Sequence, residues 1–166
     1  MIQVQVWRKE ACVFQSAALN EAVVSGSGIS KILNLDIRLK QAGLGSYRAD
    51  GIIVSTPTGS TAYSMAAGGP ILSPDMDALI LNPICPFSLS HRPLVLPGWE
   101  VVHAGIGTQR TGVLLTVDGQ IEFALETDDE VRIQAAPFRA QILGPHHRNF
   151  YDVLKTKLNW AGGHDA

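Results

Sequence analysis

The chain has 166 residues and a mass of 17.8 kDa, a length typical of one domain with a core of its own. Its 13 lysine and arginine residues stand against 15 aspartate and glutamate residues, and this formal net charge of −2 excludes a nucleic-acid or membrane-surface binder that relies on bulk positive charge. With 46% hydrophobic and 17% charged residues, the sequence is that of an ordered globular protein, part of whose surface is expected to contact another domain or subunit.

Short apolar segments predict a mainly β domain. Residues 2–8 alternate apolar and polar side chains, the pattern of a strand with one buried face. An apolar stretch at 17–24 contains an embedded Asn20-Glu21 pair, and Asp118-Gly119 predicts a tight turn between two strands. Further short strands are predicted at 32–39, 101–106, 111–117, 121–125 and 131–142. Regularly spaced short strands indicate a layered, sandwich-like β fold.

Two segments are predicted as helices. One is a short helix at 60–67, after the central strand, and the other is a C-terminal helix at 149–160. In the second segment the apolar residues recur at helical spacing and form one stripe. We therefore divide the chain into a β-rich domain at 1–148 and a C-terminal helix and tail at 149–166, whose apolar stripe needs a further surface to cover.

Residues 50–70 form the most informative segment. The apolar run at 52–54 predicts a strand buried on both faces, Pro57 ends it, and Thr58 or Ser60 is expected to cap the next helix. Free amides at that helix N-terminus would bind an anion or a polar ligand. On local features alone, a well-capped structural helix is the better interpretation. Neither G-x-G-x-x-G nor G-x-x-x-x-G-K-[ST] occurs, which excludes a Rossmann fingerprint and a P-loop.

Metal and disulfide chemistry are not predicted. Cys12 and Cys85 lie in no C-x-x-C pair, which favours two reduced thiols. Six acidic residues between 118 and 130 are interpreted as a solvated strand edge, and no histidine lies in a zinc motif. No signal segment or membrane-spanning run is found in the sequence, so we expect a soluble, cytoplasmic protein without membrane or nucleic-acid partners.

The string at 50–64, Asp-Gly-Ile-Ile-Val-Ser-Thr-Pro-Thr-Gly-Ser-Thr-Ala-Tyr-Ser, resembles the signature of the NAD kinases. Other family motifs are resembled in the same order along nearly the whole chain: Ala18-Leu-Asn-Glu-Ala22, Ala67-Gly-Gly-Pro-Ile71, residues 82–96, Val117-Asp-Gly-Gln120 and Asn149-Phe-Tyr151. The resemblance implies an enzyme that phosphorylates the adenosine 2′-hydroxyl of NAD to give NADP, with ATP or polyphosphate as donor and Mg²⁺ or another divalent cation.

One departure limits what the resemblance implies. The family has an N-terminal α/β domain with a Gly-Gly-Asp-Gly motif, whose aspartate is the proposed base, followed by a β-rich C-terminal domain. The sequence contains no Gly-Gly-Asp-Gly. The chain therefore resembles the C-terminal domain alone, with no catalytic residue of its own, and is expected to be inactive by itself. Its tail helix would pack on the missing domain.

Carried over residue by residue, the resemblance places Asn20 and Glu21 at ribose hydroxyls near the point of phosphoryl transfer, where positioning does most of the catalysis. Thr61, Ala62 and Tyr63 would contact the adenosine part of NAD, with the tyrosine ring packing on it. The structural alternatives are a polar bulge in a strand for Asn20-Glu21 and an ordinary half-buried core aromatic for Tyr63.

The resemblance assigns three further positions. Asp50 would bind the nicotinamide carboxamide, from its own chain or from a neighbouring subunit, and Arg48 would assist. A solvated pair at a strand start explains these two residues equally well. Ala66 would face the ligand one turn after Ala62, but relatives often have a serine here, so that hydrogen bond would be lost.

Two other functions are weighed against this one. The chain could be a non-catalytic dinucleotide-binding and assembly module, or a relative of the lipid kinases, which would need a large apolar cavity. In the favoured interpretation NAD or NADP and ATP are the ligands, and the low charged fraction predicts a homodimer or homotetramer.

Overall fold

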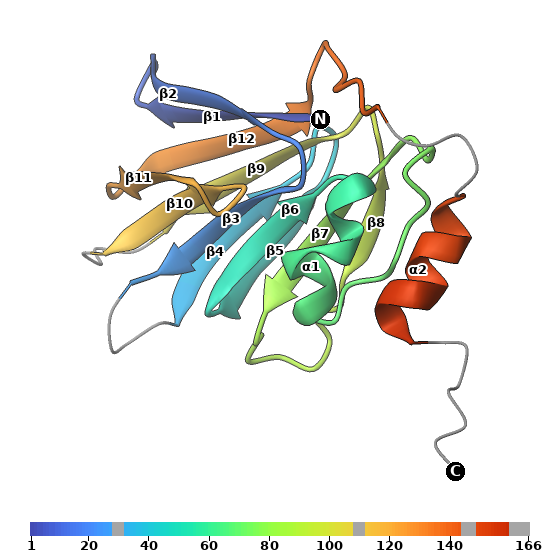
Figure 1. Ribbon diagram of the computed structural model, residues 1–166. Coiled ribbons are helices and arrows are strands. Elements are labelled where there is room, and N and C mark those ends of the chain that lie inside the picture. Colours follow the sequence, from blue (N-terminus) through green and yellow to red (C-terminus); the bar gives the residue numbers. More distant parts are fainter. Residues whose placement is uncertain (28–31, 108–111, 144–148, 160–166) are drawn as a thin grey trace.

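Two antiparallel sheets of six strands each form the fold (Figure 1). The computed structural model describes residues 1–27, 32–107, 112–143 and 149–159. One sheet has the order β2-β1-β12-β9-β4-β5 and the other has the order β11-β10-β3-β6-β7-β8. The mainly β, sandwich-like architecture predicted from the sequence is confirmed.

The first sheet consists of β1 (Ile2–Arg8), β2 (Ala11–Ala18), β4 (Leu33–Arg38), β5 (Gly43–Ala49), β9 (Val101–Ile106) and β12 (Asp129–Ala135). The second consists of β3 (Glu21–Gly26), β6 (Gly51–Ser55), β7 (Ala78–Ile84), β8 (Leu94–Pro97), β10 (Val113–Val117) and β11 (Ile121–Leu125). The helices are the 3-10 helix η1 (Thr58–Thr61), α1 (Tyr63–Ala66) and α2 (Phe150–Leu158).

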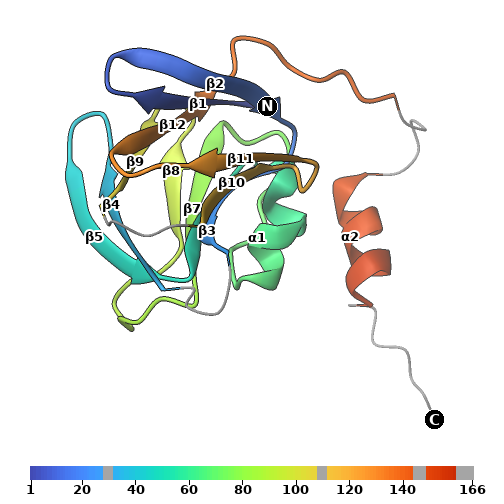
Figure 2. The same cartoon turned by 90° about the vertical axis from the view of Figure 1, so that its left-hand side faces the viewer.

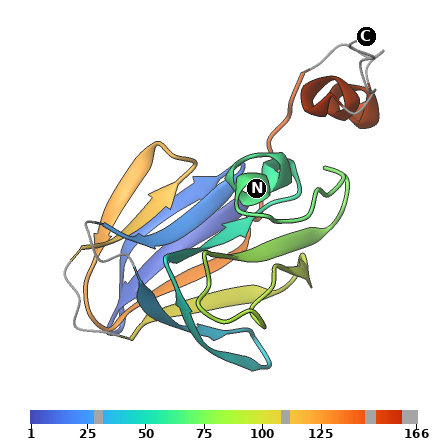
Figure 3. The same ribbon diagram turned by 90° about the horizontal axis from the view of Figure 1, so that it is seen from below.

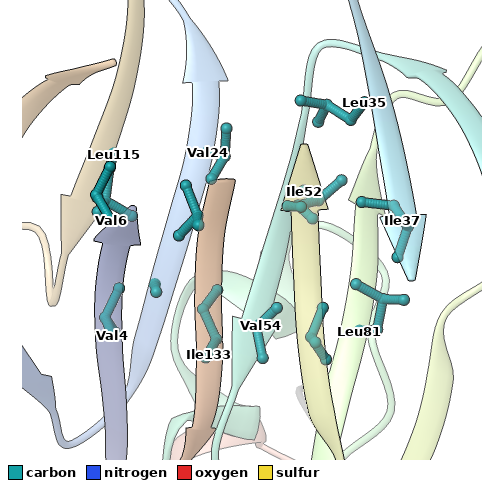
Figure 4. Close-up of a cluster of buried hydrophobic side chains, with 14 of the residues drawn as sticks. Val4, Val6, Val24, Leu35, Ile37, Ile52, Val54, Leu81, Leu115 and Ile133 are labelled. Atoms are coloured by element: carbon teal, nitrogen blue, oxygen red, sulfur yellow. The ribbon is translucent and has the colours of Figure 1, made fainter. Parts of the chain in front are cut away.

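The core lies between the sheets and is built from alternating aliphatic side chains. Val4 and Val6 of β1 are fully buried, as are Ile52 and Val54 of β6 in the other sheet. All four belong to one cluster of buried side chains drawn from strands of both sheets (Figure 4). Burial of each such side chain contributes about 1.5–3 kcal/mol to the free energy of folding, so the core holds the two sheets together.

The central strand β6 is buried along its whole length, as its unbroken apolar run predicted. Ile52 and Val54 face the core, whereas Ile53 and Ser55 face the opposite side of the sheet, over which η1 and α1 pack. Asn82 of the neighbouring β7 is fully buried on that side, and its Nδ2 donates a hydrogen bond to the carbonyl of Ser64 at 2.9 Å. One face of β6 is therefore core, and the other is the floor of the helical segment.

Four strands were not predicted: β5, β7 and β8, and also β2, of which the predicted stretch at 17–24 covers only the last two residues. Two glycines interrupt the alternation in β5, and β7 and β8 each contain a proline, which usually argues against a strand. Burial overrides the local signal in β7, most of which is buried on both faces, whereas the largely exposed β5 and β8 are strands through their pairing with β4 and β7.

Several predicted boundaries were wrong. The stretch at 17–24 is two strands, since β2 ends at Ala18 and β3 begins at Glu21. The strand at 131–142 ends at Ala135, two residues before Pro137. The helix at 60–67 is the pair η1 and α1. Parts of two predictions, at 111 and 160–166, lie outside the described residues.

The terminal helix α2 lies outside the sandwich, beyond an extended segment that leaves β12 (Figures 2 and 3). Asn149 caps it, because its side chain accepts a hydrogen bond from the amide of Asp152 at 2.9 Å. The four residues of the predicted apolar stripe are its least exposed ones: Phe150, Val153, Leu154 and Leu158. In the described parts of the chain, no helix has the length and apolar character needed to span a membrane.

Candidate functional site

The short connection between β2 and β3 carries Asn20 and leads into Glu21. Its backbone amides converge on one carboxylate. The amide of Leu19 donates to Asp118 Oδ2 at 2.7 Å, and those of Asn20 and Glu21 donate to Asp118 Oδ1 at 2.8 and 3.0 Å. The connection is therefore a defined turn and not the strand bulge that was the structural alternative.

Asp118 reaches this connection from the tight turn between β10 and β11. Asp118 and Gly119 both have positive φ angles, 49° and 65°, and the amide of Gln120 donates to the carbonyl of Val117 at 3.0 Å. Positive φ at both central residues is the requirement of a type I′ hairpin turn, which Asp-Gly satisfies well. The predicted tight turn is confirmed.

The carbonyl groups of the same connection are held by the end of β6. The carbonyl of Asn20 accepts hydrogen bonds from the Thr56 amide at 2.8 Å and from Ser55 Oγ at 3.1 Å. Thr56 Oγ1 donates to the carbonyl of Leu19 at 2.6 Å. Both polar sides of the connection are thus satisfied before any ligand arrives.

Gly59 brings η1 directly against this connection. A Cβ atom built on Gly59 would lie 2.2 Å from the carbonyl oxygen of Asn20, so only glycine fits. The amide of Gly59 donates to Thr56 Oγ1 at 3.0 Å, which ties the start of η1 to the same threonine. Asn20 and the η1–α1 segment therefore belong to one rigid unit.

Glu21 presents a buried carboxylate beside α1. It is 7% exposed, and its Oε2 has no hydrogen-bond partner among the described residues. Burial raises its pKa, the charge of Asp118 raises it further, and a hydrogen bond from the backbone of Tyr63 opposes both effects. A buried carboxylate oxygen without a partner is suited to accept a hydrogen bond from a ligand hydroxyl.

Several amides at the start of the helical segment, which were expected to be free for an anion or a polar ligand, already have partners in the chain. The amide of Ser60 donates to the carbonyl of Pro57 at 3.2 Å and that of Ala62 to Gly59 at 2.8 Å, while Gly59 and Tyr63 donate to Thr56 and Glu21. These amides are already used inside the turn, and α1 has only four residues. A ligand here must be held by side chains and the remaining polar atoms.

The predicted helix cap was also wrong. The N-cap positions of η1 and α1 are Pro57 and Ala62, and neither makes a side-chain capping bond. Ser60 instead binds the segment that follows, donating to the carbonyl of Leu72 at 3.2 Å and accepting from its amide at 3.0 Å. The hydroxyl that does hold the turn belongs to Thr56, for which the sequence predicted a polar contact to a ligand but no capping role.

The predicted adenosine-contacting residues lie next to Glu21. Tyr63 follows Thr61 and Ala62 and is 46% exposed, so it is not a core aromatic. Ala66 is exposed at the C-terminal end of α1. The structure thus brings together Asn20, Glu21 and the segment 61–66 through the contacts of Gly59 and Tyr63.

Arg48 and Asp50 are not part of this group within one chain. Asp50 precedes β6, whose far end is bonded to Asn20, and five residues of strand at about 3.4 Å each separate the two ends by about 17 Å. No ion pair joins Arg48 and Asp50, although both are described. The guanidinium of Arg48 instead lies 4.6 Å from the ring centroid of Phe87.

The acidic residues at 118–130 are a solvated edge only in part: Glu122, Glu126 and Asp128 are exposed, whereas Asp118, Asp129 and Glu130 are engaged in hydrogen bonds. Asp129 is 1% exposed and pairs with Arg8 at 2.9 Å, and this partner keeps its pKa below the usual value although burial acts in the opposite direction. Glu130 bonds Arg38, Arg132 and His103. In the described parts of the chain, no three His, Cys, Asp or Glu side chains are grouped so that they could hold a metal ion.

A cavity of about 410 Å³ opens beside Thr56–Thr58 and Leu19. Its lining includes the charged side chains of Asp75, Asp77 and Arg139 together with apolar residues. This mixed lining does not match the large apolar cavity that the lipid-kinase alternative requires.

Comparison with known proteins gives a consistent result. A family model described as the ATP-NAD kinase C-terminal domain matches residues 19–144. An NAD kinase of Treponema denticola is 48% identical over 163 residues, which is 98% of this chain and 57% of that protein. An NAD kinase of Desulforamulus reducens is 43% identical over 166 residues, 99% of this chain and 58% of that protein.

Solved structures agree with these sequence matches. A yeast NADH kinase in complex with NADH superposes with a TM-score of 0.74 at 36% identity, over 80% of this chain and 39% of that one. An NAD kinase from Archaeoglobus fulgidus in complex with ATP gives a TM-score of 0.66 at 28% identity, over 82% of this chain and 51% of that one. The chain spans less than three fifths of the length of these curated relatives.

Proposed function

The chain belongs to the NAD kinase family through its C-terminal domain, and we propose that it binds NAD and supports oligomerisation in an enzyme that phosphorylates the adenosine 2′-hydroxyl of NAD to give NADP. ATP or polyphosphate is the proposed phosphoryl donor. Because the chain covers 57% of the Treponema denticola relative, the activity of a complete enzyme is part of this proposal.

The observation that carries the proposal is the group formed by Asn20, Glu21 and Tyr63. The backbone of Asn20 is fixed, Glu21 keeps one buried carboxylate oxygen without a partner, and the Tyr63 ring is open to solvent beside them. A carboxylate next to a carboxamide can bind vicinal ribose hydroxyls in one orientation, and an exposed aromatic ring can stack on a base. Phosphoryl transfer depends mainly on such positioning.

In this proposal the chain binds the nucleotide, and a separate segment supplies the catalytic base that acts on the 2′-hydroxyl. The family's proposed base lies in a Gly-Gly-Asp-Gly motif that is not in the sequence. Mg²⁺ is usually bound by substrate phosphates with one or two carboxylates, not by an all-protein cage. The described residues form no such cage, so no step is assigned to the cation in this chain.

A second copy of the chain completes the proposed site. In this proposal Asp50 and Arg48, which lie at the far end of β6, reach the nicotinamide end of a dinucleotide bound to a neighbouring subunit. Exposed apolar side chains near them support a homodimer or homotetramer, since Phe87 is 71% exposed and Leu89 is 84% exposed. Packing of the 149–166 tail on an N-terminal domain and a cytoplasmic location belong to the same proposal.

Calorimetric titration of the chain with NAD and with NADP tests the binding. We expect saturable binding of NAD, weakened at least about tenfold by Tyr63→Ala and by Asn20→Ala. Glu122→Gln, at an exposed position on β11, is the matched control and should bind like the unaltered chain. Binding that is identical in all four proteins, or none at all, contradicts the proposal.

An assay of NADP formation separates a kinase domain from a non-catalytic binding module. The chain alone should form negligible NADP, and addition of a Gly-Gly-Asp-Gly domain from a relative should restore turnover. Turnover by the chain alone at the rate of ordinary kinases would show that the base lies in this chain. NAD binding with no turnover in either arrangement would favour the non-catalytic module.

A further inference from the structure

The carboxylate of Asp118 has a role that its own turn does not require. A type I′ turn forms equally well with Asn-Gly or Gly-Gly, so the turn between β10 and β11 needs no negative charge. Yet both carboxylate oxygens are engaged by the amides of residues 19, 20 and 21, which lie 97 to 99 positions away in the sequence. The carboxylate therefore serves the β2–β3 connection.

Three successive amides directed at one carboxylate fix the course of that connection. Hydrogen bonds to an ionised acceptor are about twice as strong as those between neutral groups. The amide of Asp118 adds a fourth contact by donating to the carbonyl of Glu21 at 3.0 Å. The direction in which Asn20 and Glu21 leave the backbone is thus set by Asp118.

The opposite side of the connection is closed by Ser55, Thr56 and Gly59, as described above. The backbone polar groups of Asn20 are consequently satisfied, whereas its carboxamide forms no hydrogen bond with the described residues. An immobile backbone that carries an uncommitted side chain is the arrangement expected of a ligand-binding position.

We propose that Asp118 is a positioning residue of the dinucleotide site, which it preforms by holding Asn20 and Glu21 in the binding orientation. This inference rests on the proposed function and deepens it, because it assigns the affinity for NAD partly to a residue that does not touch NAD. Preformation lowers the entropy that a ligand must otherwise supply to order the connection.

Asp118 also acts on Glu21 through its charge. The negative charge of Asp118 raises the pKa of the Glu21 carboxyl, second to the effect of burial. Removing that charge lets Glu21 ionise at lower pH. If NAD binds the ionised carboxylate, its affinity falls on acidification as Glu21 takes up a proton. In an Asp118 variant this fall should occur at lower pH, a shift that loss of packing alone would not cause.

The test compares Asp118→Gly, Asp118→Asn and the control Glu122→Gln in two measurements. Amide hydrogen exchange of residues 19–21 without ligand reports the connection, and calorimetry with NAD from acidic to neutral pH reports the site. We expect Asp118→Gly to speed this exchange and to weaken NAD binding, each by about tenfold or more, because three charge-assisted bonds are lost. Asp118→Asn, which keeps the turn and one acceptor oxygen, should lie between Asp118→Gly and the unaltered chain, and its affinity should fall on acidification at lower pH than that of the unaltered chain.

The outcomes separate this inference from the proposed function. If the unaltered chain binds NAD and Asp118→Gly binds it within twofold at every pH, the inference is overturned and the proposed function stands. If the unaltered chain does not bind NAD, the proposed function fails, and unchanged exchange in Asp118→Gly then overturns the positioning role as well. Should Asp118→Gly not fold, Asp118→Asn carries both measurements, because asparagine readily adopts positive φ.

Discussion

The two ends of β6 differ in how much one chain completes by itself. At the Ser55 end, the adjoining connection is bonded on both sides, by Asp118 and by Ser55 and Thr56, and it touches Gly59. At the Gly51 end, the bonds of Asp50 to the described residues are backbone bonds, from its amide to the carbonyl of Ile84 and to its carbonyl from the amide of Gly26. The same strand thus ends beside a fully bonded connection at one end, where we propose that NAD binds, and beside the Asp50 side chain at the other, where we propose that a second subunit contributes.

The largest effect on stability and NAD binding is expected from a substitution at the Ser55 end of β6. Gly59→Ala places a Cβ 2.2 Å from the carbonyl oxygen of Asn20 and should lower the free energy of unfolding by about 2–4 kcal/mol and abolish NAD binding. Urea denaturation and calorimetry measure the two effects. Gly43→Ala is the control, because nothing lies within 4 Å of its added Cβ and its φ is ordinary. Equal losses in both variants would refute the close packing at Gly59.

A smaller loss is expected when one hydroxyl is removed at the same end. Thr56→Val deletes the donor to Leu19 and the acceptor for Gly59 in a residue that is 4% exposed, which should lower the free energy of unfolding by about 1–3 kcal/mol. Thr58→Val removes a hydroxyl that makes no hydrogen bond with the described residues and should change stability by less than about 0.5 kcal/mol. Thermal unfolding of both variants checks the difference.

Substitution of Glu21 is expected to weaken NAD binding without lowering stability at neutral pH. The pKa of Glu21 is raised in the folded state, so the folded protein binds this proton more tightly than the unfolded chain does. Protonated Glu21 therefore stabilises the fold at low pH. This stabilisation is lost as the pH rises from the ordinary glutamate pKa of about 4.3 through the raised pKa of the folded state. Glu21→Gln should therefore be as stable as the unaltered chain at neutral pH, or slightly more stable, yet bind NAD more weakly. Denaturation at pH 4 and pH 7 with NAD titration tests this. A clear loss of stability at pH 7 would show that the carboxylate is structural.

The smallest effect on stability is expected at the other end of β6. Asp50→Asn should change the free energy of unfolding by less than about 0.5 kcal/mol, because the Asp50 side chain forms no hydrogen bond or ion pair with the described residues. Its effect on NAD affinity should depend on protein concentration, being present where sedimentation shows an oligomer and absent where it shows a monomer. A concentration-independent loss would mean that Asp50 serves the site of its own chain.

Much of the fold could be predicted from local patterns, because the segments at 2–8, 101–106 and 121–125 have the alternation or boundaries that strands require. The strands β5, β7 and β8 could not, since glycine or proline interrupts their patterns and their pairing with neighbouring strands is not visible in the local sequence. The same limit applies to the site. Asn20, Glu21 and Tyr63 are predicted through a family resemblance.

The role of Asp118 could not be predicted from the sequence, because it depends on contact between the β10–β11 turn and the β2–β3 connection, which are far apart along the chain. Its Asp-Gly dipeptide predicts a turn and says nothing of the amides at 19–21. Thr56 could have been suspected, because a threonine three residues before Gly59 often accepts from that amide. The partners of the helix-start amides could not be predicted either, because those of Ser60 and Ala62 bond nearby carbonyls whereas that of Tyr63 bonds Glu21, which is distant in sequence.

The long sequence separation between Asp118 and the β2–β3 connection has a consequence for how the protein matures. In the folded chain, residues 20, 59 and 118 are brought together by the β3–β6 and β3–β10 ladders, so we expect the connection to be complete only in molecules in which both ladders are formed. A ligand that binds there selects fully closed molecules and withdraws them from unfolding by mass action. Cellular coenzyme supply would then act on the lifetime of the polypeptide as well as on its occupancy.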